Sequence, residues 1–223
     1  MATSTVENYI KQILLEQQRN GEERVSPGRL AAELGVVPGT VTTMLKALAE
    51  AGLADYELRR GVKLTHAGQK LALHVLRRHR LIELFLVRVL GFDSSEVHSE
   101  AEELEHAVSD KLMERIDEFL EHPAFDPHGD PIPSAGGKLS HASLRPLTAC
   151  EKDSRVRIAR ILDQDSQFLR YTNSNGLVPG AILTIQQRDL DGDNITVKIE
   201  GKPPISLGSA ASEKIMVERC PPA

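Results

Sequence analysis

The spacing of apolar residues in the first third of the chain predicts three helices followed by a hairpin. Apolar positions recur every three or four residues over 4–19, the pattern of an amphipathic helix. Residues 26–35 begin with a serine–proline pair that favours a helix start and end at glycine, and residues 38–52 begin with proline and end at glycine. Residues 53–64 alternate loosely around an Arg-Arg-Gly turn. This order is typical of a winged helix-turn-helix, whose second helix enters the DNA major groove.

The rest of the chain predicts further helices, a loose connection and a small β domain. Helical spacing runs from about His66 to Leu90 and again over 93–120, in one or two pieces. Residues 123–149 are rich in proline and glycine and poor in large apolar side chains, which is typical of a linker. The period then changes to two, and four short strands predict a small β-barrel: 155–161, 181–185, 194–199 and 214–218.

Length and composition narrow the class of protein. At 223 residues the chain has room for two or three small domains. No stretch is apolar enough to span a bilayer, and the first residues lack the basic and apolar runs of a secretory signal. Cys150 and Cys220 are far apart and outside any metal-ligand spacing, so we expect plain thiols in a cytoplasmic protein.

The formal net charge of −5 conceals a strong asymmetry along the chain. Residues 24–90 carry a net charge of +6, whereas residues 91–131 carry −11. The basic region coincides with the predicted winged helix, and local positive charge attracts phosphate whatever the total charge is. The acidic region repels itself until a cation or a partner neutralises part of it. We therefore expect the first region to bind DNA and the second to bind a cation.

Polar and basic side chains occupy the positions from which a winged helix contacts DNA. On the exposed start of the predicted recognition helix these are Thr40, Thr42, Thr43 and Lys46. The preceding helix supplies Arg29, and the wing supplies basic residues suited to backbone phosphates: Arg59, Arg60 and Lys63. A winged helix that contacts only proteins is the alternative, because fold alone does not fix function.

Metal-ligating residue types follow the winged helix within a short stretch of chain: His79, Glu83, His98, Glu102, Glu105 and His106. Those on each predicted helix are spaced by three or four residues, so they share one helix face. Imidazole nitrogens and carboxylate oxygens without a thiolate suit Mn²⁺, Fe²⁺, Zn²⁺ or Co²⁺. A metal site beside a DNA reader suggests a switch in which metal occupancy sets the DNA affinity.

Simpler interpretations of these residues stay open at this point. Ser99 and Glu102 have the spacing of a capping box, and acidic residues suit the start of a helix. Glu83 has basic neighbours with which it can pair. The other five histidines, His128 among them, are expected to be surface or packing residues. A hydrolytic metal enzyme is a further alternative, but no glycine-rich phosphate loop or nucleophile elbow accompanies the cluster, so we expect no enzymatic activity.

Several motifs occur in a specific order after the helix-turn-helix. These are Arg-His-Arg-Leu-x-Glu at 78–83, an acidic run with two histidines at 91–110, and His-Gly-Asp-Pro-Ile-Pro at 128–133. Together they resemble the diphtheria toxin repressor family of iron- and manganese-dependent transcriptional regulators. Residues 176–180, Gly-Leu-Val-Pro-Gly, resemble the SH3-like domain of that family and the ferrous transport protein A domain.

The resemblance implies a chain that is mainly α with a small β domain. Its parts would be a winged-helix DNA-binding domain over 1–65, a helical dimerisation and metal-binding domain over 66–133, a linker over 134–153 and an SH3-like domain over 154–223. It further implies a homodimer on double-stranded operator DNA. The lack of a stretch apolar enough to span a bilayer leads us to expect no membrane partner. The long helices would pair, and the run Leu81–Leu90 is the expected interface.

The resemblance also implies two metal sites in each protomer. The primary site matches Asn8, Glu102, Glu105 and His106. The ancillary site matches His79, Glu83 and His98, and Gln164 and Gln167 stand where ligands from the SH3-like domain would come from.

The primary site departs from the family's patterns at two positions. Iron-type members have Met and Cys, and manganese-type members have Asp and Glu, where this chain has Asn8 and Glu102. Glu102 is a hard ligand that favours Mn²⁺, while Asn8 offers a neutral carbonyl oxygen. Lys11 stands where a two-domain manganese regulator supplies a carboxylate, so we do not expect that regulator's close dinuclear arrangement, and the hard ligand Glu102 decides the expected metal. We therefore expect a manganese-activated repressor of metal-uptake genes; the alternatives are an iron-activated repressor and a winged-helix regulator whose metal is structural.

Overall fold

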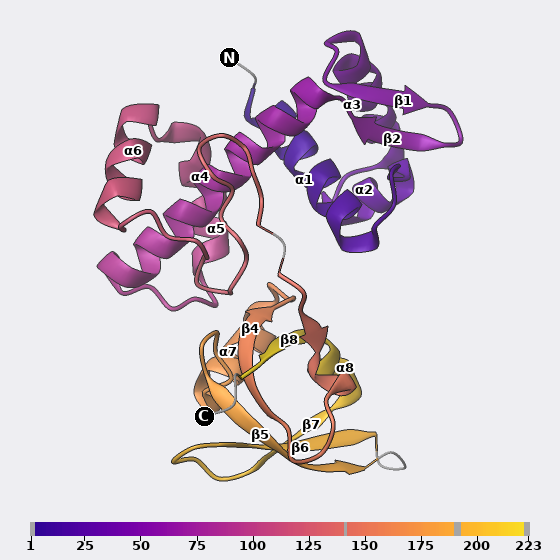
Figure 1. Cartoon of the computed structure of the whole chain (residues 1–223). Helices are drawn as coiled ribbons and strands as arrows, with labels where there is room; N and C mark the ends of the chain where they lie inside the picture. The colour runs from indigo at the N-terminus through magenta and orange to yellow at the C-terminus, as the bar shows by residue number, and fades with distance from the viewer. Residues whose placement is uncertain (1–2, 141, 190–192, 221–223) are drawn as a thin grey trace. The chain divides into compact units, whose positions relative to one another are not determined.

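The computed structural model describes residues 3–140, 142–189 and 193–220 (Figure 1). The chain divides, inside its long central helix, into two compact units. The first comprises the chain through His79 together with Pro133–Leu139. The second comprises Arg80–Ile132 and the chain from Ser140 onward. The first unit therefore holds the winged helix, and the second holds the acidic helices and the β domain.

The three predicted helices of the winged helix are confirmed as α1 (Ser4–Asn20), α2 (Pro27–Glu33) and α3 (Pro38–Glu50). The Ser26 hydroxyl caps α2 by accepting a hydrogen bond from the Arg29 N–H. Apolar side chains with no exposed surface come from all three helices and form one core: Ile10, Ile13, Leu30, Val41 and Leu45. This core packs α3 against α2 and leaves the first turn of α3 exposed.

The predicted wing is an antiparallel hairpin of β1 (Ala54–Glu57) and β2 (Gly61–Leu64). A third segment joins it, since Val25 and Val62 exchange two backbone hydrogen bonds of 2.8 and 2.9 Å. Gly61 permits this approach, because its φ is +98° and a Cβ there would lie 2.4 Å from the Val25 carbonyl oxygen. The residues just before α2 are therefore fixed beside the wing.

The long helix α4 (His66–Leu90) has the predicted bounds, and the Thr65 hydroxyl caps its start by accepting from the Gly68 N–H at 3.1 Å. The predicted segment 93–120 forms two helices, α5 (Val97–Ala107) and α6 (Asp110–Phe119). Across the ranges described above, no helix combines the length and the apolar character that crossing a membrane requires.

Burial within one chain corrects part of the expected dimer surface. In the predicted Leu81–Leu90 run, four side chains that are at most 4% exposed pack into the core of the second unit: Leu81, Ile82, Leu84 and Leu86. A partner chain cannot bury them again. The large apolar side chains left exposed on these helices include Val89 and Leu90 at the end of α4 and Leu112 and Phe119 on α6.

The β domain contains a six-stranded antiparallel sheet in the order β3-β8-β4-β5-β6-β7 (Figure 1). Four of its strands confirm the sequence prediction: β4 (Arg155–Ile161), β5 (Ile182–Asp189), β6 (Asn194–Ile199) and β8 (Ile215–Arg219). Alternate apolar residues of these strands form a second core, which also buries Cys150. Burial raises the pKa of the Cys150 thiol, and both cysteines are free.

Several short elements of the β domain were not predicted. They are β3 (Arg145–Pro146), the 3-10 turn η1 (Leu147–Ala149), α7 (Ser166–Asn175), β7 (Ile205–Gly208) and α8 (Ser209–Glu213). Residues 145–149 lie in the predicted linker, yet Arg145 and Pro146 pair with β8. This pairing shows that the linker prediction is wrong for residues 145–149. The two strands β3 and β7 were missed because strands of two to four residues carry too few positions to show a period of two.

Candidate metal centre and DNA-binding surface

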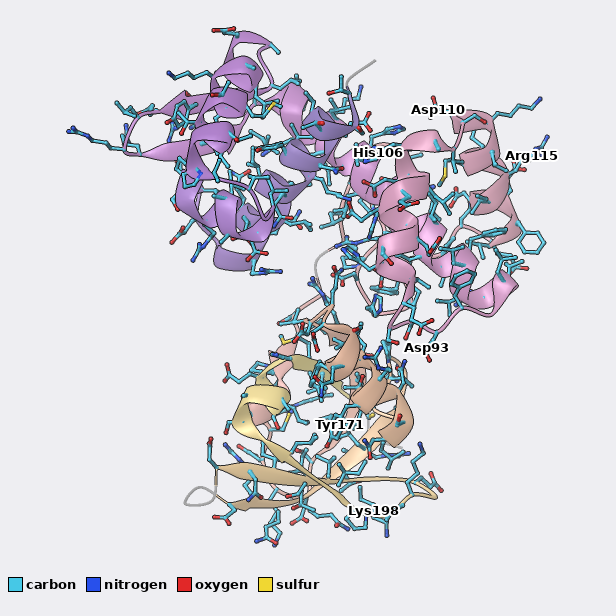
Figure 2. The ribbon with its side chains drawn as sticks, turned by 180° about the vertical axis from the view of Figure 1, so that it is seen from behind. Asp93, His106, Asp110, Arg115, Tyr171 and Lys198 are labelled. Atoms are coloured by element: carbon cyan, nitrogen blue, oxygen red, sulfur yellow. The ribbon has the colours of Figure 1, made fainter. Side chains whose placement is uncertain are left out.

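The metal-ligating residue types predicted from the sequence lie on two helices. His79 and Glu83 are one turn apart on α4, and the others follow along α5: His98, Glu102, Glu105 and His106 (His106 is labelled in Figure 2). Glu83 is fully buried, and His79 and Glu105 are 3% and 1% exposed. Burying carboxylates and imidazoles is unfavourable without compensating charge or hydrogen bonds. Their burial therefore points to a cation or to a polar network.

Imidazoles approach carboxylates at two places along α5. The Nδ1 atom of His98 lies 3.4 Å from Oε1 of Glu83, and its Nε2 atom lies 3.8 Å from Oε1 of Glu102. Further along, Nε2 of His106 lies 3.4 Å from Oε1 of Glu105. Each imidazole thus stands beside an oxygen ligand, which is the mixed donor chemistry expected for a divalent transition metal.

His79 is common to two sets of ligand atoms. In each set the atoms lie within 4.8 Å of one another: His79 with Glu83 and His98, and His79 with Glu102 and Glu105. The first set is the one the sequence assigned to the ancillary site. The second set joins His79, assigned to the ancillary site, to Glu102 and Glu105, assigned to the primary site. The two predicted sites are therefore not cleanly separated.

The capping-box interpretation of Glu102 is wrong. Helix α5 has Glu96 as its N-cap, and the hydroxyl of Ser99 lies inside the helix, where it donates to the Glu96 carbonyl oxygen at 3.3 Å. Glu102 then stands in the middle of α5, too far along the helix to cap its first turn. Its carboxylate is therefore a ligand candidate rather than a cap.

A third set of ligand atoms includes two residues that sequence reasoning missed. Glu83, Asp126 and His128 place ligand atoms within 4.8 Å of one another, and all three residues are buried. The Nε2 atom of His128 lies 2.8 Å from the carbonyl oxygen of Ser94. A carbonyl only accepts, so Nε2 carries a proton, and in the neutral imidazole Nδ1 then keeps its lone pair. A backbone acceptor of this kind is the usual means of orienting a metal-binding imidazole.

Two buried atoms of this set test whether a cation fits. Among the described residues, neither Nδ1 of His128 nor Oδ2 of Asp126 has a hydrogen-bond partner. The Asp126 oxygen has only a longer ion-pair contact, 3.6 Å from Nε of Arg80. A buried lone pair and a buried carboxylate oxygen without hydrogen bonds are what a cation site needs. The residues present therefore fit a divalent metal.

The loop that carries Asp126 and His128 is held firmly in place. Oδ1 of Asp126 accepts hydrogen bonds from the N–H groups of His128 and Asp130, at 2.8 and 2.9 Å. Arg80 donates to the Pro131 carbonyl oxygen at 2.6 Å. Burial, followed by the carboxylates of Asp130 and Glu83, raises the pKa of Asp126 well above its ordinary value, although Arg80 opposes the shift. A cation bound here would therefore displace a proton.

The missed residues gave only a faint signal in the sequence. His128 opens the His-Gly-Asp-Pro-Ile-Pro motif, but it is more than forty positions from Glu83, and no helical period links residues so far apart.

The three predicted amide ligands belong to none of these sets. Gln164 and Gln167 are exposed, before and within α7. Asn8 lies on α1, in the first unit. For these three residues, as for the other candidate ligands, the role of metal ligand stays a prediction.

The exposed start of α3 carries the residues predicted to contact DNA. Thr40 and Lys46 are exposed. The hydroxyls of Thr42 and Thr43 donate to the carbonyl oxygens one turn earlier, at 3.0 and 3.1 Å, which fixes their orientation and leaves them able to accept. Arg29, on α2, lies 3.5 Å from a carboxylate oxygen of Glu16.

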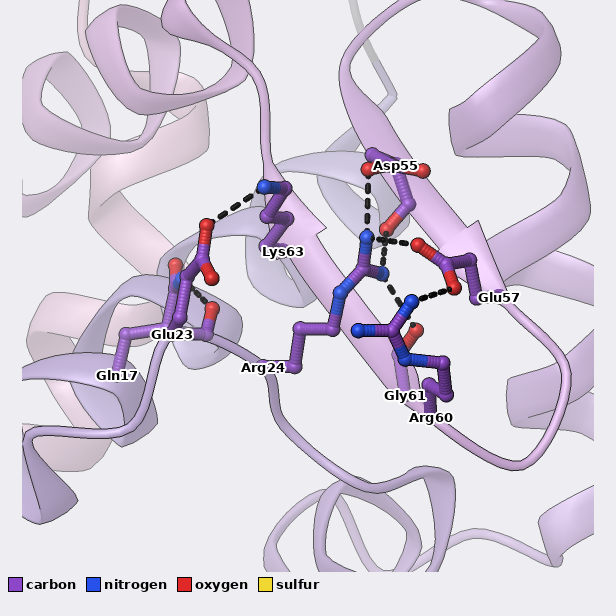
Figure 3. A network of polar contacts seen from close by, with 8 residues as sticks. All are labelled: Gln17, Glu23, Arg24, Asp55, Glu57, Arg60, Gly61 and Lys63. Carbon is purple, nitrogen blue, oxygen red and sulfur yellow. Dashed lines mark hydrogen bonds and ion pairs between the residues drawn. The ribbon is translucent and has the colours of Figure 1, made fainter.

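The wing's basic side chains are paired with acids (Figure 3). Arg60 and Lys63 each contact a carboxylate at 2.6 Å, Arg60 that of Glu57 and Lys63 that of Glu23. Arg59 is at the tip, with a φ of +68°. The side chain of Arg59 forms no ion pair with any residue that the structure describes. The prediction that these cations contact phosphates therefore has to account for the acids already bound to two of them.

A winged helix followed by helices with buried imidazoles and carboxylates defines a class of DNA-binding protein that responds to a metal. Three family models match the chain in this order: "Iron dependent repressor, N-terminal DNA binding domain" over residues 1–62, "Iron dependent repressor, metal binding and dimerisation domain" over 65–134, and "FeoA domain" over 145–219.

Whole-chain relatives agree with these matches. The iron-dependent repressor IdeR of Mycobacterium leprae is 30% identical, over 96% of this chain and 97% of its own. A solved manganese-dependent transcriptional repressor in complex with manganese is 41% identical, with a TM-score of 0.87 over 96% of this chain and 100% of its own. The manganese regulator SloR is 31% identical, with a TM-score of 0.75 over 96% of this chain and 98% of its own. The chain belongs to the diphtheria toxin repressor family of metal-dependent transcriptional regulators.

Proposed function

We propose that this member of the family is a manganese-activated repressor of metal-uptake genes. Ligand chemistry carries the proposal. Every atom in the three sets on α4, α5 and the 126–128 loop is an imidazole nitrogen or a carboxylate oxygen. Such donors suit Mn²⁺, whereas a thiolate would favour softer ions. Iron is the second candidate, because the mycobacterial relative is named an iron-dependent repressor.

The proposed primary site consists of Asn8, Glu102, Glu105 and His106. The proposed ancillary site consists of His79, Glu83 and His98, and we add Asp126 and His128 because they share Glu83. Gln164 and Gln167 are proposed as further ligands on the sequence resemblance alone. His79 lies within reach of ligand atoms from both proposed sites, Glu83 and His98 of the ancillary site and Glu102 and Glu105 of the primary site. This supports a coupling of the two sites through one imidazole.

Activation would act through the buried acids. A bound divalent cation supplies positive charge to a region with a net charge of −11. Glu83 and Glu105 are buried, so their mutual repulsion with neighbouring carboxylates is poorly screened until it is neutralised. With this repulsion relieved, the ligands hold α4 and α5 in one arrangement. A ligand from α1, Asn8, would extend that effect to the N-terminal helix and convert binding free energy into a DNA-binding conformation.

The proposed repressor acts as a homodimer on double-stranded DNA. Leu90, Leu112 and Phe119 are 58%, 50% and 67% exposed. Side chains of this size, exposed on helices that otherwise bury their apolar stripe, favour coverage by a second copy. The proposed division of labour is DNA binding by residues 1–65, dimerisation and metal binding by 66–133, and an SH3-like domain over 154–223.

Metal-dependent DNA binding tests this proposal directly. Genomic fragments would be selected with the manganese-loaded protein, and their affinity for chelated protein compared with that for protein saturated with Mn²⁺, Fe²⁺, Zn²⁺ or Co²⁺. We expect weak binding in chelator and full activation by Mn²⁺, at least equal to that by Fe²⁺. Affinity for Mn²⁺ alone does not identify the effector, because binding strength rises from Mn²⁺ to Co²⁺ in most sites. Protein saturated with Mn²⁺ that fails to bind, while Fe²⁺ activates, would overturn the manganese assignment.

A further inference from the structure

One face of the wing carries a network of charged side chains in which acids and bases alternate (Figure 3). It is built by the segment before α2, by both strands of the hairpin and by the turn between them: Glu23, Arg24, Asp55, Glu57, Arg60 and Lys63. Asp55 and Lys63 are cross-strand partners in the β1–β2 register, so they share this face. The network therefore occupies a surface predicted to meet DNA phosphates.

Arg24 holds the network together through contacts with both strands of the hairpin. Its side chain is 13% exposed and donates to the Asp55 and Gly61 carbonyl oxygens at 3.1 and 3.2 Å. The same guanidinium contacts the carboxylates of Asp55 and Glu57 at 2.7 and 2.5 Å. Because Arg24 directly precedes Val25, which is bonded to β2, its backbone is fixed as well. The acids of β1 are thereby held in a defined place.

These acids form ion pairs with the basic side chains that would otherwise contact DNA. Glu57 reaches Arg24 with one oxygen and Arg60 with the other, the second at 2.6 Å. Glu23 holds Lys63 at 2.6 Å, and the hydrogen bond from Lys63 lowers the pKa of Glu23, so this acid is ionised whenever DNA binding is measured near neutrality. Of the three wing cations, Arg59 alone lacks such a partner among the described residues. The wing is therefore partly neutralised by its own acids.

We propose that Glu23 and Glu57 determine specificity by screening Lys63 and Arg60 from DNA of arbitrary sequence. This inference deepens the proposed function, since it rests on DNA binding by the winged helix. In a chance encounter, a phosphate near Lys63 or Arg60 meets a carboxylate as well, and the two charges cancel. When α3 is fully seated in its preferred sequence, the phosphates are held in place and can displace the acids, because exposed ion pairs are weak.

Counterion release makes the screening measurable. Each cation that newly contacts a phosphate steepens the slope of log affinity against log salt by about 0.9. Releasing one cation should tighten binding to arbitrary DNA by about five- to tenfold at ~0.1 M salt. A carboxylate-to-amide change keeps the shape of the side chain and removes only its charge. Glu23→Gln and Glu57→Gln are therefore suitable variants, and Glu23 is 75% exposed, so its folding role is small.

The experiment measures binding of the full-length, manganese-saturated protein to a labelled duplex of arbitrary sequence at several salt concentrations. Glu23→Gln should steepen the salt slope and tighten binding. Glu200→Gln, which removes the same charge from an exposed position in the second unit, is the matched control. Lys63→Gln should change little in the wild-type background but should abolish the gain in the Glu23→Gln background. Arg59→Gln should weaken binding in the wild type more than Lys63→Gln does.

Two results would overturn the inference. One is a gain for Glu23→Gln no larger than that for Glu200→Gln. The other is a gain that persists after Lys63→Gln is added, because the released charge would then not act through Lys63. Failure of the proposed function is distinguishable from both. In that case metal leaves the affinity for selected genomic fragments unchanged, while the comparison on arbitrary DNA still reports whether the acids screen the wing.

Discussion

Replacing Asp126 by asparagine should stabilise the metal-free protein and destabilise the metal-loaded protein relative to wild type. Without metal, the buried carboxylate of Asp126 lies near those of Asp130 and Glu83, and the guanidinium of Arg80 and the backbone N–H of Asp130 only partly offset the repulsion. Asparagine keeps the Oδ1 acceptor used by the N–H groups of His128 and Asp130. Its amide can also donate to neighbouring groups. With metal, the same change removes an anionic ligand from the set formed with Glu83 and His128.

The expected size follows from the environment of Asp126. Removing a poorly compensated buried charge is worth about 1–3 kcal/mol of unfolding free energy, or a rise in Tm of roughly 2–10 °C for a protein of this length. In the opposite direction, metal at a thousand times its Kd stabilises the folded protein by about 4.1 kcal/mol, which exceeds that gain. Asp126→Asn should therefore be more stable than the wild type without metal and less stable than the wild type when the metal is added.

The pH dependence has a defined sign in the chelated wild type. The raised pKa means that folded Asp126 keeps a proton that the unfolded chain has released. The free energy of unfolding should therefore fall as pH rises from the ordinary aspartate range toward the raised pKa. Asp126→Asn should remove this contribution.

Thermal unfolding in chelator and in excess Mn²⁺, over a range of pH, measures both effects. Asp130→Asn is the informative comparison, because Asp130 pairs with Arg80 and Arg160 and its loss should lower the Tm of the metal-free protein. The reasoning is refuted if Asp126→Asn lowers the metal-free Tm as Asp130→Asn does. It is equally refuted if the variant gains as much from Mn²⁺ as the wild type does.

Two further substitutions test the assignment of ligands. His106→Ala should abolish metal-dependent DNA binding, and His79→Ala should only weaken it, as titrations of each variant on a selected genomic fragment would reveal; the reverse order would place His79 in the primary set. Glu102→Cys introduces a thiolate and should shift activation from Mn²⁺ toward Fe²⁺ or Co²⁺. Unchanged relative activation by the three metals would argue against Glu102 as a ligand.

Local sequence determined most of the secondary structure. Ser26 and Pro27 marked the start of α2, and the apolar period of His66–Leu90 matched α4 at both ends. Helix periodicity also placed His79 beside Glu83 and predicted the shared face of α5. These features depend on residues within one or two turns of each other, so the order of residue types is sufficient to predict them.

Only the tertiary structure decided which distant side chains meet. Asp126 and His128 join Glu83 because the loop after α6 is fastened by Arg80, and Glu23 meets Lys63 because Gly61 lets Val25 approach β2. Four side chains of the interface expected over Leu81–Leu90 are likewise buried in the chain's own core: Leu81, Ile82, Leu84 and Leu86. Such contacts follow from which apolar faces are buried together and which backbone groups find partners across the fold. A periodic pattern within one segment carries no information about either.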